Sequence, residues 1–61
     1  MTESVKQALI AAEEALEGSN IEIRQLLRKF GPQEMAHDAI GANKHAIDLI
    51  VEALGAEPTS P

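Results

Sequence analysis

Apolar residues recur every three or four positions through the first half of the chain. The most regular set steps alternately by four and three residues, and Ser19 is its only polar member. Its members are Val5, Leu9, Ala12, Leu16, Ser19, Ile23, Leu26 and Phe30. This heptad spacing is typical of a helix that packs against another helix. It predicts an α-helix over about residues 3–30 whose seam contacts a second helix.

A turn follows at Gly31-Pro32. Glycine suits the position just after a helix, and proline suits the first turn of the next one, where its missing N–H is no loss. A second heptad set predicts a helix over about residues 32–54, and Gly55 and Pro58 supply its stop signal. That set is Ala36, Ile40, Asn43, Ile47, Ile50 and Leu54. The predicted fold is all-α: one antiparallel helical hairpin domain, residues 1–55, and a disordered tail over residues 56–61.

The first helix has one weak point, at residues 18–20. Gly18 is able to end a helix, and Ser19 with Glu22 three residues later fits a capping box that would open another. This alternative has three helices. Because the heptad phase runs through the segment without a slip, we favour a continuous helix, straight or kinked.

The two polar seam positions are predicted to meet. Folding the chain about Gly31 sets Ser19 level with Asn43. A single polar layer in an apolar seam fixes register and partner number at some cost in stability. Asn43→Leu is then expected to raise stability and loosen the oligomeric state. The alternative is that Ser19 begins a helix and Asn43 points to water.

A second stripe of mainly small residues lies beside each seam. A broad apolar face is what a helix in a bundle requires, so the stripes predict a homo-oligomer, most simply a dimer forming a four-helix bundle, or a larger bundle. The alternative is that alanines simply favour helix on a solvated face. The predicted oligomer interface is Ala8, Ala11, Ala15, Met35, Ala39, Ala42, Asn43, Ala46, Leu49 and Ala53.

Composition strengthens the case for self-association. The chain has 61 residues and no cysteine, and a single core of this size contributes only ~3–5 kcal/mol. Disulfides and thiolate zinc sites are excluded.

The charge balance argues against double-stranded DNA as a partner, because ten acidic and five basic residues give a net charge of −5. The chain has no apolar run long enough for a membrane span and no secretion signal, so we expect a cytoplasmic protein.

Enzymatic chemistry finds no support in the sequence. It contains no nucleophile-elbow glycine pattern and no phosphate-binding loop, so no catalytic residue is assigned. Glu34 and His37 have the Glu-x-x-His spacing of di-metal bundles. The inward positions of that helix are Ala36, Ile40 and Asn43, however, so the pair is expected at the flank. No metal and no cofactor are predicted.

One cluster of hydrogen-bond donors lies around the turn. Arg24 and Arg28 are one helical turn apart, a spacing suited to phosphate or carboxylate groups. Together with Lys29 and His37 they form a candidate site for a small anionic ligand such as a nucleotide. The alternative is that Arg28 and Lys29 merely stabilise the end of a helix dipole, while Arg24 pairs with Glu22 or with the acids of the second helix.

Two architectural resemblances follow from these features. The Gly31-Pro32 hairpin and the heptads interrupted at Ser19 and Asn43 resemble Rop, a family of small plasmid-encoded RNA-binding hairpin dimers. The simple helical pattern is also similar to small phage proteins that form oligomers and sequester cyclic nucleotide signals. The leading expectation is a non-enzymatic adaptor, inhibitor or assembly factor that binds proteins. Ligand sequestration and RNA binding are what the resemblances imply as alternatives.

Overall fold

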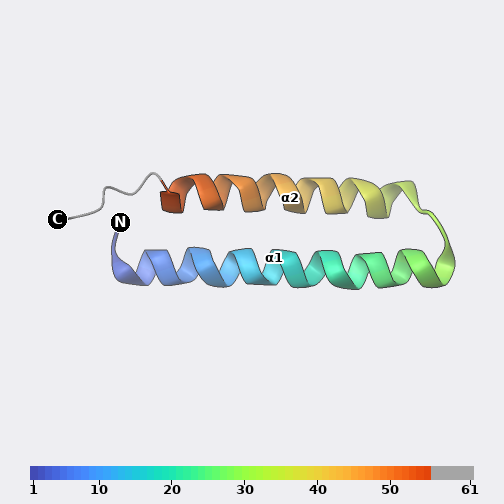
Figure 1. The fold of residues 1–61 in the computed structure, drawn as a ribbon, viewed down its shortest axis with the longest axis horizontal. Coiled ribbons are helices and arrows are strands. Elements are labelled where there is room, and N and C mark those ends of the chain that lie inside the picture. Colours follow the sequence, from blue (N-terminus) through green and yellow to red (C-terminus); the bar gives the residue numbers. More distant parts are fainter. Residues whose placement is uncertain (56–61) are drawn as a thin grey trace.

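The computed structural model is an antiparallel pair of helices, α1 (Glu3–Phe30) and α2 (Glu34–Gly55), joined by a tight turn (Figure 1). The structure describes residues 1–55. The tail predicted over residues 56–61 lies outside that range. The start of α1 and the end of α2 lie at the same end of the molecule, which we call the open end. The predicted all-α helical hairpin is confirmed.

Helix α1 is continuous over 28 residues. Thr2 caps it, since its Oγ1 accepts a hydrogen bond from the N–H of Val5 at 3.2 Å. Glu3 lies in the first turn, and Arg28 and Lys29 lie in the last, so charges of both signs complement the helix dipole. Residues 18–20 are helical, so the continuous helix is confirmed and the three-helix alternative is wrong.

The turn differs in one detail from the prediction. The N–H of Gly31 donates to the carbonyl of Leu27 at 2.9 Å and ends α1, with φ 87° and ψ 176°, a conformation open essentially to glycine alone. Pro32 does not lie in the first turn of α2, which begins at Glu34. Gln33 takes the capping position because its carbonyl accepts hydrogen bonds from the N–H groups of Ala36 and His37, both at 3.1 Å. Because the ψ angle of Gly31 is extended, the chain regains helical geometry only at Glu34, after Pro32 and Gln33.

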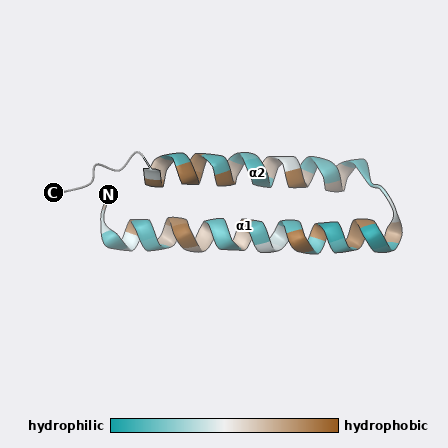
Figure 2. Cartoon of the chain, viewed as in Figure 1, coloured by the Kyte–Doolittle hydropathy of each residue, from teal (hydrophilic) through white to brown (hydrophobic). Residues whose placement is uncertain are grey.

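The hairpin is elongated and has a thin interior. Its radius of gyration is 14.5 Å, against about 10.5 Å for a compact chain of 61 residues. Apolar bands recur along the side of α2 that is turned toward α1 (Figure 2). No hydrophobic side chain in residues 1–55 is buried, and Asn20 is the one buried residue there. Two helices alone therefore leave the apolar side chains only partly covered.

Candidate functional site

A polar layer crosses the middle of the hairpin. The side-chain amide of Asn43 donates from Nδ2 to Oδ1 of Asn20 at 2.9 Å and to Oγ of Ser19 at 3.4 Å. The predicted meeting of Ser19 with Asn43 is confirmed. Asn20, which is only 3% exposed, supplies the shorter contact and was not predicted. The layer lies within one chain and fixes the register of α2 on α1.

The face of α1 that packs against α2 is rotated about the helix axis from the predicted face. Leu9, Leu16 and Ile23 are partly buried, as expected. Val5, Ala12 and Leu26, expected beside them, are exposed, and Phe30 is 65% exposed. Their places toward α2 are taken by a set with the same spacing: Lys6, Glu13, Asn20 and Leu27.

Both arrangements satisfy the same spacing of four and three residues, so periodicity alone does not separate them. The contact between Asn43 and Asn20 favours the observed arrangement, because an amide enclosed between helices without a partner costs about 1–3 kcal/mol. The six seam positions predicted for α2, by contrast, are all partly buried.

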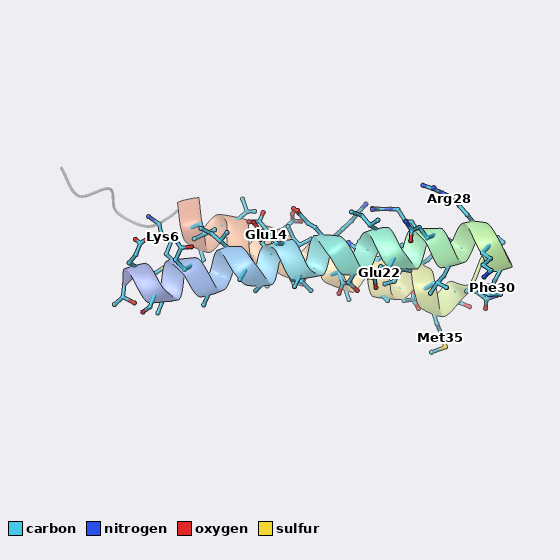
Figure 3. The ribbon with its side chains drawn as sticks, turned by 90° about the horizontal axis from the view of Figure 1, so that it is seen from below. Lys6, Glu14, Glu22, Arg28, Phe30 and Met35 are labelled. Atoms are coloured by element: carbon cyan, nitrogen blue, oxygen red, sulfur yellow. The ribbon has the colours of Figure 1, made fainter. Side chains whose placement is uncertain are left out.

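The turned seam leaves one edge of the hairpin apolar. Figure 3 shows Met35 directed to one edge and Arg28 with Glu14 to the other. On α2, Ala42 and Leu49 follow Met35 at intervals of seven and so share its direction. On α1, the exposed set that contains Leu26 flanks the seam on the side away from Arg28. We call this surface the apolar edge: Val5, Ala12, Leu26, Met35, Ala42 and Leu49.

The predicted interface residues fall into three groups. Ala39 and Ala46 are partly buried between the helices and border the apolar edge, and Asn43 lies inside the hairpin. Met35 is 85% exposed and Leu49 53%. The remaining members are also exposed: Ala8, Ala11, Ala15, Ala42 and Ala53. Leu26, which is 53% exposed, and Val5 belong to the apolar edge but were assigned to the hairpin seam by the sequence pattern.

The structure divides the predicted ligand cluster. Arg24, Arg28, Lys29 and His37 are all exposed. Figure 3 shows Arg28 on the edge opposite Met35. Helical periodicity places Arg24, one turn before Arg28, on that edge, and it places His37, two residues after Met35, on the side of α2 away from Met35. Lys29 is turned away from them, and its Nζ lies 5.3 Å from the centroid of the Phe30 ring.

Arg24 and Arg28 have no acidic residue three or four positions away on α1. Within residues 1–55 neither guanidinium forms an ion pair. Like charges at this spacing cost about 0.2–0.5 kcal/mol in an isolated helix. The two arginines are therefore available to an external anion.

Metal-ligating side chains remain scattered in residues 1–55, where no three or more histidine, aspartate or glutamate groups gather into a possible metal site. Glu34 and His37 are exposed at the flank of α2, as the inward heptad positions of that helix predicted. Neither α1 nor α2 combines the length and apolar character that a membrane crossing requires. Comparison with known proteins gives no match to a family model, a curated protein or a solved structure.

Proposed function

We propose that this chain is a self-associating helical hairpin that acts in the cytoplasm through protein–protein contacts, as an adaptor, inhibitor or assembly factor. One observation carries the proposal. No hydrophobic side chain of residues 1–55 is buried within the hairpin, while Leu26, Met35 and Leu49, each more than half exposed, share one edge. A second copy of that edge would complete a four-helix bundle.

The free energy of burying exposed apolar side chains favours self-association over a monomer that functions alone. Fully burying one Leu or Met side chain contributes about 1.5–3 kcal/mol. Leu26, Met35 and Leu49 are each more than half exposed, so covering them contributes an amount comparable with the whole core of a chain this small, ~3–5 kcal/mol. Alanines between the large residues let helix backbones approach closely.

Light scattering coupled to size exclusion tests the proposal. The chain has a mass of 6.5 kDa, and we expect at least twice that value in solution. Leu26→Glu combined with Leu49→Glu places charges in the apolar edge and should reduce the mass to that of one chain. Ile21→Glu is the matched control, since Ile21 is 55% exposed but lies on the Arg28 edge, seven residues from Arg28.

The Ile21 variant should keep the mass of the parent protein. A parent protein that is folded and monomeric would contradict the proposal. Equal loss of mass in the Ile21 and Leu26/Leu49 variants would show that the apolar edge is not the contact surface.

A second candidate function is the binding of a small anionic ligand, and the unpaired Arg24 and Arg28 favour it. Both are exposed on the same edge as His37. A thermal-shift series with nucleotides should show stabilisation that Arg24→Ala and Arg28→Ala abolish. Lys44→Ala, which removes an exposed cation nearer the open end, should leave the response intact. No shift with any phosphate ligand would remove this candidate.

A further inference from the structure

Charge is distributed unevenly along the hairpin. The half that holds the turn, residues 20–42, has three cationic and three acidic side chains. The open half, residues 1–19 and 43–55, has two cationic and six acidic side chains, a net side-chain charge of −4. The cations of the turn half are Arg24, Arg28 and Lys29, and those of the open half are Lys6 and Lys44. The hairpin is thus neutral at one end and strongly acidic at the other.

Side-chain size also differs along the apolar edge. The contacts of Asn43 with Ser19 and Asn20 set the register of the two helices. In that register Met35 lies beside Leu26, so both helices present large side chains in the turn half. Leu49 lies beside Ala12, so at that level a large side chain is paired with a small one, and Val5 lies further toward the open end. Among the described members of the edge, large side chains of the two helices lie side by side only in the turn half.

We propose that the occupant of the apolar edge is a second copy in antiparallel orientation, with the turn of each copy over the open end of the other. This inference rests on the self-association proposed above and adds the orientation. A two-fold axis near the polar layer brings Leu26 and Met35 of one copy opposite the Ala12 and Leu49 level of the partner. The same surface then serves both copies, as a two-fold dimer requires.

Electrostatics supports this orientation over the parallel one. Neighbouring helices in a bundle lie about 8–10 Å apart, which is comparable with the Debye length of about 8 Å at physiological ionic strength. The charged side chains lie outside the apolar edges and are further apart than the helix axes, so the difference in repulsion between the two orientations is a net, long-range effect that grows as the salt concentration falls. A parallel dimer would place two halves of charge −4 side by side. The antiparallel dimer places each acidic half beside a neutral one.

The orientation can be measured with a single spin label, because the chain has no cysteine to remove. Gln33→Cys places a label in the turn, where the capping hydrogen bonds use the backbone carbonyl and survive the substitution. With a rise of 1.5 Å per residue, the antiparallel dimer puts the two labels about 35 Å apart. The parallel dimer puts them within ~20 Å, given the interaxial spacing and the reach of the labels.

Lys44→Cys is the control for dimer formation. Lys44 is exposed close to the level of the polar layer, so its label-to-label distance depends little on orientation. The proposal expects a dipolar signal from both labels, with a single distance near 35 Å for Gln33→Cys. A distance of ~20 Å or less, or two distances together, would overturn the antiparallel orientation. No dipolar signal from either label would overturn self-association itself.

Discussion

Asn20 is the residue whose placement organises the interior. It is the one buried residue of the described chain, and its Oδ1 accepts the 2.9 Å hydrogen bond from Asn43. Asn43 and Ser19 are predictable from the sequence because they interrupt otherwise apolar seams. Asn20 is not, because its heptad set includes Lys6 and Glu13, and a set with two charged members is typical of a solvent-facing side. The hydrogen bond between Asn20 and Asn43 accompanies the arrangement in which this less apolar set faces α2.

The pairing changes the outcome expected for Asn43→Leu. On the sequence alone the substitution is expected to raise stability. With Asn20 as its buried partner, Asn43→Leu leaves Oδ1 of Asn20 without a donor and should lower the free energy of unfolding by about 1–3 kcal/mol. Asn20→Leu combined with Asn43→Leu removes both polar groups and should restore or exceed the parent stability.

Urea unfolding of the four proteins in this cycle gives the coupling energy. The two substitutions are expected to be strongly non-additive, since the residues are in contact. Additive effects would show that Asn20 and Asn43 are not paired in solution.

At the scale of the elements, both helices were predictable because their signals are local. Heptad spacing, the Thr2 cap and the glycine after Phe30 each act within a few residues. The rotation of α1 was not predictable, because its apolar positions cover a wide arc and any part of that arc can face α2. The start of α2 was placed two residues early, since the conformation of Gly31 sets where the chain regains helical geometry.

Two glycines should respond in opposite ways to the same substitution. Gly18 lies inside α1, and a methyl group there meets no neighbouring atom within 4 Å. Gly18→Ala should raise the free energy of unfolding by ~0.5–1 kcal/mol through helix propensity. Gly31 has φ 87° and ψ 176°, so Gly31→Ala should lower it by about 1–3 kcal/mol.

Thermal unfolding followed by circular dichroism measures both effects. Gly41→Ala is a further control, as Gly41 is helical, exposed and clear of neighbours. A gain from Gly41→Ala with a loss from Gly18→Ala would place Gly18 against another chain. Tolerance of Gly31→Ala would contradict the turn geometry described here.

At the scale of the whole molecule, the hairpin presents two different edges. The apolar edge carries large exposed side chains, and the opposite edge carries Arg24, Arg28 and His37. In the proposed antiparallel dimer the apolar edges face each other. The two arginine pairs then lie at opposite ends of the bundle and on opposite outer surfaces. Each pair would have to bind an anion without help from the other.

Because the interior of the hairpin is thin, the proposed self-association would couple folding to protein concentration. If the second copy supplies the missing core, folding and association form one equilibrium, and the folded fraction depends on how much protein is present. The melting temperature should then rise as the protein concentration is raised, whereas a self-sufficient monomer would melt at one temperature throughout. In a cell, the rate of synthesis would set the shape of this chain as well as its amount, because scarce copies would stay unfolded and open to proteolysis.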